Sequence, residues 1–473
     1  MTKFPLWRLS ASELAERIAR REITADTAIT ATVDHMRAVN GHLNAVVDDL
    51  GDEAIVQARN LDAIMGKSGP VGPLHGVPIT IKENVDQKGR ATPNGVKAFA
   101  DVIAPDDAPI VRNLTQDGAI VIGRTNTPEF SFRATTTNEL HGRTFNPWND
   151  WASPGGSSGG ASSAVMSGMG AIAHGNDIGG SLRFPSAATG AVTVKPGLGR
   201  TPAWNPSQKA ERGILAQLMS VQGVICREAR DVRLAMRSAI RYDPHDPWQA
   251  PAPFDGPALE RPIKIAFTKN TYQFEMHAAI VEALDHARDC LVDSGYDVVE
   301  VDTPDISVIG ETGYRALMTE VRLLMMDDIR KFGSAEINRM FDEYFELFPP
   351  FEYDELLRQM ARRSSFIREW NLFLEQYPIV LTPFLPRPTY AWNRDAEGKD
   401  GVMEVLGCGI WSFAINYLGL PSGIVSSGMH DGMPVAVQIV GRRFREDLIL
   451  NALEAIEARV GVMAKKLFER AQQ

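Results

Sequence analysis

The sequence contains little cysteine. Its 473 residues include Cys226, Cys290 and Cys408, which are odd in number and far apart along the chain. No Cys-x-x-Cys pair and no Cys/His pair has the spacing of metal ligands. Because separated cysteines are also a poor basis for a disulfide framework, we expect three buried, reduced thiols and no metal site.

An excess of basic residues is also missing. The chain has 49 Lys and Arg against 59 Asp and Glu, which gives a formal net charge of −10. Nucleic acids and anionic membranes bind basic surfaces, so this balance argues against both kinds of partner. The main consequence we expect from this charge is solubility.

The sequence offers neither a secretory leader nor a long apolar run. The N-terminal stretch MTKFPLWRLSASELAERIARREI is interrupted by charges and contains no continuous apolar core. The longest uncharged, largely apolar stretch, residues 161–173, is rich in Gly and Ser and too short to cross a bilayer. We therefore expect a cytoplasmic protein that does not bind membranes.

The chain does contain alternating strand and helix patterns. Ser10 and Glu13 form a capping box that opens an amphipathic helix. Short β-branched runs suit buried strands, and periodic segments between them suit helices. We expect strands at 77–81, 119–122, 263–267 and 296–301, and helices at 26–39, 107–116, 277–293 and, as the last helix, 446–460. This alternation predicts an α/β protein.

Residues 305–375 are mainly helical in pattern and rich in Met, Phe and Tyr. Core packing is the ordinary explanation for such residues. The alternative is that some of them line an apolar substrate pocket, because such pockets use aromatic side chains and Met. The candidates for this lining are Met318, Met325, Met326, Phe332 and, outside the segment, Phe184.

The most informative segment is the Gly/Ser-rich run at 154–161, followed by D-I-G-G-S-L-R at 177–183. A flexible linker is one interpretation, but residues 161–173 form a run of small side chains suited to a tightly packed helix. A phosphate-binding loop would require a terminal G-K-[ST], which is absent. Neither interpretation accounts for the segment.

A nucleophile elbow is a closer alternative, because residues 156–160 fit G-x-S-x-G. The elbow must follow a buried strand, and the preceding sequence NPWNDWASP cannot form one. A Ser-His-Asp triad would also need a later histidine, and His286 and His430 lie in ordinary sequence surroundings. A serine can instead be activated by a lysine that burial keeps neutral. Lys82 is a candidate because it ends the apolar run 77–81, although a surface lysine is the ordinary expectation there.

Three motifs in a fixed order decide between these alternatives. They are G-V-P-I-T-I-K-E-N at 76–84, G-G-S-S-G-G at 155–160 and D-I-G-G-S-L-R at 177–183. Together they resemble the amidase signature family, in which two serines lie twenty-four residues apart, as Ser157 and Ser181 do. The resemblance covers most of the chain, because it extends to F-N-P-W-N at 145–149, K-P-G at 195–197, L-P at 420–421 and G-M-P-V-A-V-Q-I-V-G at 432–441.

The resemblance implies an α/β amidase signature fold, in which a central twisted mixed β-sheet is covered by helices on both faces. It also implies hydrolysis of a small-molecule amide through an acyl-enzyme, without a metal or a cofactor. Carried over to this sequence, Ser181 is the nucleophile, Ser157 relays its proton and neutral Lys82 is the base. In the family a cis peptide bond holds the relay serine.

The same resemblance assigns an oxyanion hole to the turn before the nucleophile. The backbone N–H groups of Ile178, Gly179 and Gly180, with that of Ser181, are expected to converge on the developing negative charge. Glycine is suited to this turn because it places no side chain in the way.

Ser158 is expected to shape the loop, and Asp177 and Arg183 to give the site polar support. A plain surface ion pair is an alternative for Arg183. Two residues depart from the family pattern: Asn176 stands where Thr is more usual and Leu182 where Ile is more usual. We expect neither to touch a catalytic group.

Within the family the sequence favours a free-standing amidase. The glutaminase subunit of the glutamyl- or aspartyl-tRNA amidotransferase is the second choice, but it usually has Gln after the motif arginine, where this chain has Phe184. Its R-R-x-x-L-G-T-Y-like segment is also not found in residues 305–375. An esterase or hydrazidase stays open because these share the acyl-enzyme step. A non-enzymatic scaffold is disfavoured because all three catalytic residues are present.

We expect one amidase domain over residues 1–473, and a homodimer is a possible assembly. The apolar candidates named above favour a substrate with an apolar or aromatic group. Four parts of the domain are expected: N-terminal helices at 1–70, the signature core at 71–225, a variable substrate-shaping region at 226–400 and the C-terminal part of the core at 401–473.

Overall fold

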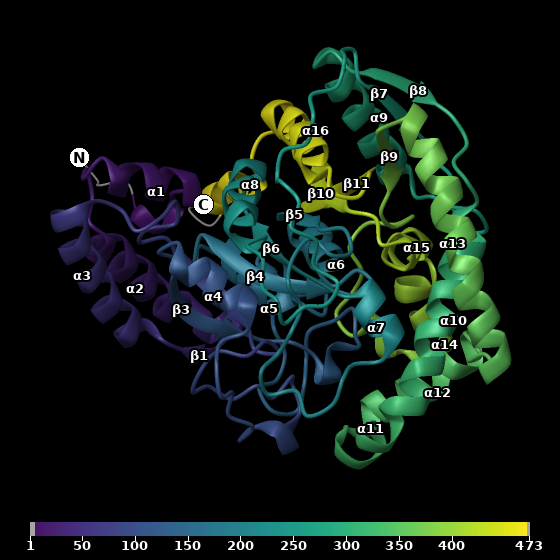
Figure 1. The fold of residues 1–473 in the computed structure, drawn as a ribbon, viewed down its shortest axis with the longest axis horizontal. Helices are drawn as coiled ribbons and strands as arrows, with labels where there is room; N and C mark the ends of the chain where they lie inside the picture. Colours follow the sequence, from purple (N-terminus) through teal and green to yellow (C-terminus); the bar gives the residue numbers. More distant parts are fainter. Residues whose placement is uncertain (1–4, 471–473) are drawn as a thin grey trace.

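The computed structural model describes residues 5–470, and within them one eleven-stranded sheet forms the centre of the protein (Figure 1). The strand order is β1-β3-β2-β4-β6-β5-β10-β11-β9-β7-β8. The strands are β1 (Val46–Asp49), β2 (Pro78–Lys82), β3 (Ile120–Thr125), β4 (Ile172–Asp177), β5 (Val192–Lys195), β6 (Val221–Cys226), β7 (Lys264–Phe267), β8 (Asp297–Glu300), β9 (Ile379–Pro383), β10 (Ser422–His430) and β11 (Met433–Gly441).

The sheet is mixed. β2 runs parallel to both β3 and β4, with Lys82 opposite Thr125 and Thr80 opposite Ala173. β4 and β5 run antiparallel to β6, and β10 joins β5 to β11 through antiparallel pairs. The carboxyl ends of β2, β3 and β4 therefore meet at one edge of the sheet, where open α/β sheets hold their ligands.

Helices cover both faces of the sheet, as predicted. Alternate residues of β3 show this division: Val121 packs in the core that β2 and β3 share with α4, α8, α9 and α16, whereas Ile120 and Ile122 pack against α2 and α3. Figure 1 shows α1–α3 at one end of the molecule and α10–α14 at the other. The α-helices are α1 (Ala11–Ala19), α2 (Ala25–Leu43), α3 (Gly51–Ser68), α4 (Pro109–Gln116), α5 (Gly159–Met166), α6 (Arg183–Thr189), α7 (Ile214–Met219), α8 (Ala229–Ala239), α9 (Ala278–Asp293), α10 (Ile306–Leu324), α11 (Met326–Phe332), α12 (Ala335–Leu347), α13 (Tyr353–Gln376), α14 (Gly398–Val402), α15 (Ile410–Leu418), α16 (Glu446–Val460) and α17 (Met463–Arg470).

Two expectations about the helices are corrected. The small-residue run 161–173 is not one helix, because α5 ends at Met166 and Gly168 and Gly170 adopt φ values of 82° and 106°, after which β4 begins. Such positive φ values interrupt a right-handed helix. The helix at 446–460 is correct in extent, but it is not the last one, since α17 follows it.

No single helix within residues 5–470 is both long and apolar enough to cross a bilayer. Residues 398–407 and α15 together have the length and the apolar composition of a membrane span, but nothing beyond length and composition supports one. The two halves of this pair meet at an angle of 54°.

Candidate active site

Lys82, the last residue of β2, lies fully buried at the edge where the three parallel strands end. Its Nζ contacts Ser157 Oγ at 2.7 Å and Asn176 Oδ1 at 2.8 Å. Burial lowers the pKa of Lys82 to about 7, and the negative charges of Asp177 and Glu83 limit the fall. An amine with this pKa is about half neutral at pH 7 and mostly neutral above it.

Asn176 contacts the candidate base, which corrects the expectation that neither departure from the family pattern touches a catalytic group. Its Nδ2 donates to Asn84 Oδ1 at 2.9 Å, and Asn84 Nδ2 donates to Ser131 Oγ at 3.0 Å. Lys82, Asn176, Asn84 and Ser131 are therefore joined by successive side-chain hydrogen bonds. Asn84 stands in the first signature motif, two residues after Lys82, and this position was the only sequence signal for its place in the site. Leu182, the second departure, is buried in the core.

Ser157 lies in the loop that leads into α5, and the peptide bond between Gly156 and Ser157 is cis. Thr127 Oγ1, two residues beyond the end of β3, donates to the Ser157 carbonyl at 2.9 Å. Ser158 Oγ donates to the Asn176 carbonyl at 3.5 Å. The loop is thus held by residues at the ends of β3 and β4, while the Ser157 hydroxyl faces Lys82.

Ser181 lies in the turn that follows β4, four residues after Asp177. Gly180 has a φ of 122° and donates its N–H to Asp177 Oδ1 at 2.8 Å. A Cβ on Gly179 would lie 2.5 Å from the Phe413 ring, so a side chain at this position would collide. The N–H of Gly180 is occupied, and within residues 5–470 those of Ile178, Gly179 and Ser181 have no protein acceptor.

Asp177 and Arg183 form a buried ion pair, with both side chains fully inaccessible. The guanidinium donates from Nε and Nη2 to the two carboxylate oxygens at 3.1 Å, and from Nη1 to Gln438 Oε1 at 3.0 Å. Burial opposes ionisation of Asp177, but Arg183 overrides this effect and lowers the pKa to about 2. The alternative of a surface ion pair for Arg183 is therefore wrong. Gln438 belongs to the C-terminal motif at 432–441. That motif therefore supplies a hydrogen-bond partner to the arginine of the D-I-G-G-S-L-R motif.

Two cavities meet at Ser181. The first, called the narrow pocket here, encloses about 50 Å³. The second, called the wide cavity, encloses about 480 Å³. Ser181 and Ile178 line both, whereas Ser157 and Asn176 line only the wide cavity. Within the described residues, no histidine lines either one, so a histidine base has no support from the geometry.

The narrow pocket is lined mainly by aromatic and aliphatic side chains, which are Phe132, Ala134, Ile178, Phe184, Tyr314, Leu317, Met318, Tyr344, Leu406 and Phe413. Phe184 and Met318 were expected in such a lining. Met325 instead lines the wide cavity, Met326 is buried in the core, and Phe332 is partly buried against that core. The tyrosines were not singled out, although residues 305–375 as a whole were.

No group of three or more His, Cys, Asp and Glu side chains within residues 5–470 could hold a metal ion. The three cysteines are buried and unpaired, as expected.

The sequence pattern of the protein family described as Amidase matches residues 27–450, which is most of the chain. The chain belongs to the amidase family. This finding confirms the resemblance stated from the signature motifs.

Two related sequences and one solved structure show which known proteins this chain is similar to. An indoleacetamide hydrolase of Bradyrhizobium diazoefficiens is 47% identical, over 99% of this chain and 89% of that protein. A glutamyl-tRNA(Gln) amidotransferase subunit of Moorella thermoacetica is 28% identical, over 96% of both chains. A bacterial aryl acylamidase of the amidase signature family superposes with a TM-score of 0.84 at 25% identity, covering 98% of this chain and 99% of that one. These findings confirm the predicted fold and the prediction of an amide hydrolase, and the amidotransferase protein is the more distant relative.

Proposed function

We propose that this amidase hydrolyses the primary amide of an arylacetic acid, to the carboxylate and ammonia, with indole-3-acetamide as the first substrate to test. The observation that carries the catalytic part is the 2.7 Å contact between Lys82 Nζ and Ser157 Oγ, at a cavity that Ser181 also lines. The 47% identity to an indoleacetamide hydrolase supports the choice of substrate.

The proposed reaction has two halves. Ser181 Oγ attacks the amide carbon while its proton passes to Ser157 and the Ser157 proton passes to neutral Lys82. The same relay returns a proton to the nitrogen, the C–N bond breaks and ammonia leaves. Water then attacks the acyl-enzyme by the reverse relay and releases the carboxylate and free Ser181. Esters of the same acids share this acyl-enzyme and are expected to react.

Negative charge on the carbonyl oxygen is met by three backbone donors in this proposal. The N–H groups of Ile178, Gly179 and Ser181 are the donors without an acceptor, and each is typically worth about 3 kcal/mol in a transition state. Gly180 was also expected to donate, but its N–H is bound to Asp177. Its part in the proposal is to shape the turn.

The acyl group occupies the narrow pocket, whose walls suit an aromatic ring. At about 50 Å³ the pocket admits such a ring only when side chains move aside. Met318 is the flexible residue of the lining, and methionine adapts to irregular shapes through three rotatable bonds. Phe184, which follows the motif arginine, closes the pocket beside Ser181.

Purified protein incubated with indole-3-acetamide should release ammonia and indole-3-acetate in equal amounts. Ser181→Ala should abolish this release, because the attacking oxygen is lost. Ser157→Ala should be nearly as severe, and Ser158→Ala milder, because Ser158 contacts only a backbone carbonyl. Intact activity in Ser181→Ala, or no hydrolysis of any arylacetamide by the wild type, would overturn the proposal.

A further inference from the structure

Of the two cavities at Ser181, only one is lined by Ser157. This difference indicates which cavity holds the acyl group of the substrate and which holds the leaving amine. In the proposed function, on which this inference rests, Ser157 returns a proton to the leaving nitrogen. Ser157 lines the wide cavity and not the narrow pocket. The leaving nitrogen therefore lies on the side of the wide cavity, and the acyl group lies in the narrow pocket.

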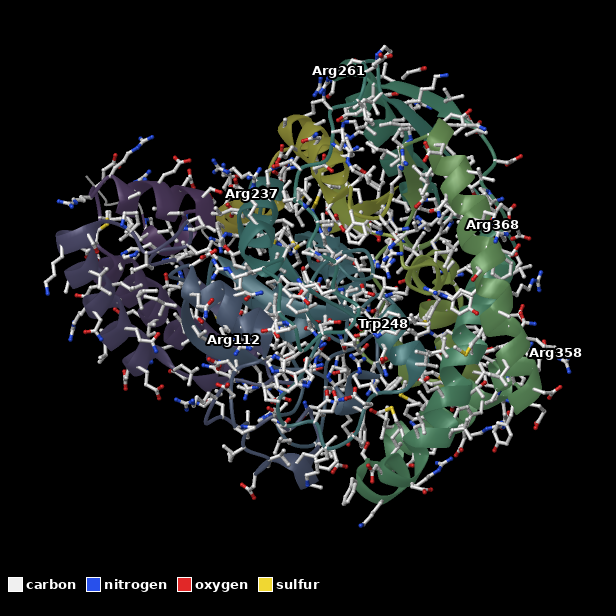
Figure 2. The ribbon with its side chains drawn as sticks, viewed as in Figure 1. Arg112, Arg237, Trp248, Arg261, Arg358 and Arg368 are labelled. Carbon is white, nitrogen blue, oxygen red and sulfur yellow. The ribbon has the colours of Figure 1, made fainter. Side chains whose placement is uncertain are left out.

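The wide cavity is much larger than the release of ammonia requires. Its volume is about 480 Å³, whereas a molecule the size of water fills about 30 Å³ in the liquid. It also continues into an outer cavity of about 430 Å³, and Arg212 lines both. Trp248 lines the outer cavity and lies beside α7, donating its Nε1–H to Gln217 Oε1 at 3.0 Å (Figure 2). This space can accommodate a substituent on the amide nitrogen.

Arg212 is the cation of the wide cavity, and within residues 5–470 its guanidinium has no hydrogen-bond or ion-pair partner. The charges of Glu320 and Asp246 act on Arg212, but the oxygens of both acids accept other groups. Glu320 accepts two backbone N–H groups of α7 at 2.7 and 2.9 Å, and Asp246 accepts two backbone N–H groups at 2.7 Å each. Exposed Glu211 accepts from Gln208 Nε2 at 3.3 Å. The Arg212 guanidinium, at the wall of the cavity, is thus available to a ligand.

We propose that this amidase also cleaves secondary amides whose amine part carries a carboxylate, that is, N-arylacetyl amino acids, and that Arg212 binds that carboxylate. A guanidinium and a carboxylate match through two parallel charge-assisted hydrogen bonds. The reaction is the same hydrolysis: the C–N bond breaks, the C–O bond to Ser181 forms and then breaks with water, and the nitrogen leaves as a neutral amine with the relayed proton.

The test compares kcat/KM for indole-3-acetamide, for its N-butyl analogue and for its conjugates with glycine, β-alanine and 4-aminobutanoate. The wild type should cleave at least one conjugate better than the N-butyl amide. Arg212→Gln should lower the ratio of conjugate to N-butyl amide by about tenfold or more, because a charge-assisted bond is lost. Arg212→Lys should keep part of that ratio. Because the ratio is taken within one variant, a general loss of folded enzyme does not change it.

A second variant tests the placement of the two substrate halves. Ala216, on α7, lines the wide cavity and not the narrow pocket. Ala216→Leu should lower kcat/KM for the N-substituted amides relative to indole-3-acetamide. An equal loss on indole-3-acetamide would mean that the aryl group occupies the wide cavity, and would overturn the inference.

The remaining outcomes separate this inference from the proposed function. Cleavage of indole-3-acetamide without cleavage of any conjugate, or an unchanged ratio in Arg212→Gln, would overturn the inference alone. No hydrolysis of any of these amides would overturn the proposed function itself.

Discussion

At the scale of single residues, the proposed chemistry depends on the direction of the lone pair of Lys82 Nζ. A neutral lysine has two N–H donors and one lone pair, and Asn176 Oδ1 accepts one of those donors at 2.8 Å. Because Asn176 is held by Asn84, the lone pair of Lys82 is oriented toward Ser157 rather than left to rotate. The motif residues Lys82, Ser157 and Ser181 could be named because their three motifs resemble the amidase signature family. The Asn176 contact could not, since it depends on the register of β2 beside β4.

The pH dependence of the rate follows from the state of Lys82. Burial lowers its pKa to about 7, and the proposed mechanism requires the deprotonated form. We expect kcat/KM for indole-3-acetamide to rise through about pH 7 and to stay high on the alkaline side. Lys82→Arg should be inactive throughout, because guanidinium does not lose its proton in this range. An active Lys82→Arg enzyme with the wild-type profile would identify a different base.

Asn176→Asp should move that profile. A carboxylate 2.8 Å from Nζ would favour the ammonium form, which raises the pKa of Lys82 and shifts the rising limb by about one to three units toward alkaline pH. Asn176→Thr, which carries the more usual residue of the family, is the control and keeps an oxygen without the charge. The measurement is the midpoint of kcat/KM against pH. An unmoved midpoint in Asn176→Asp would show that the side chain has no influence on the base.

At the scale of elements, β4 and the turn after it determine the site. The strand ends at Asp177, whose two oxygens accept from the N–H groups of Gly180 and Leu182 as well as from Arg183. One carboxylate thereby fixes the turn and anchors α6.

Strand β4 was not predicted from the sequence, because the small-residue run at 161–173 suggested a longer helix. Two glycines in the left-handed region end that helix, and composition alone does not reveal their φ values. The helix after residue 460 was missed because α17 has only eight residues, although its buried positions, Met463, Ala464, Leu467 and Phe468, have helical spacing.

Asp177→Asn should destabilise the fold strongly. It leaves the buried Arg183 guanidinium without its counter-charge, and breaking a buried pair in this way typically costs about 3–5 kcal/mol. Arg358→Ala is the matched control, because Arg358 lies on the outer side of α13 (Figure 2) and its pair with Asp354, at 2.7 Å, is about 70% exposed. That change should cost less than about 1 kcal/mol. Denaturant unfolding of the two variants measures the difference. Equal losses would contradict the assignment of the Asp177 pair as a structural centre.

At the scale of the whole molecule, two buried lysines link stability to pH. Burial lowers the pKa of both Lys82 and Lys195 to about 7, with Arg183 adding to the effect at Lys195. The same groups titrate near 10.4 in an unfolded chain, so between pH 7 and 10 the unfolded state binds more protons. The contribution of these two lysines to the free energy of unfolding should therefore rise with pH across this window, by up to about 1.4 kcal/mol per pH unit for each lysine.

Lys195→Met tests this linkage without changing the proposed base. The variant should show a smaller slope of unfolding free energy against pH between pH 7.5 and 9.5, measured in denaturant at several pH values. An identical slope would mean that Lys195 keeps its proton in the folded protein.

The alternation of strands and helices predicted the α/β class because it depends on local pattern. The order of the strands in the sheet could not be predicted from local sequence pattern. β10 and β11 come from the end of the chain, yet they lie between β5 and β9.

That strand order has a consequence for synthesis on the ribosome. β5 ends at Lys195, and its neighbour β10 begins at Ser422, 227 residues later. At ordinary translation speeds this interval lasts roughly 10–45 s. During that time the nascent chain presents an apolar strand edge with unpaired backbone groups, which is a surface prone to aggregation. We therefore expect that the emerging chain is shielded, by a chaperone or by its own helices, until residue 430 has left the exit tunnel.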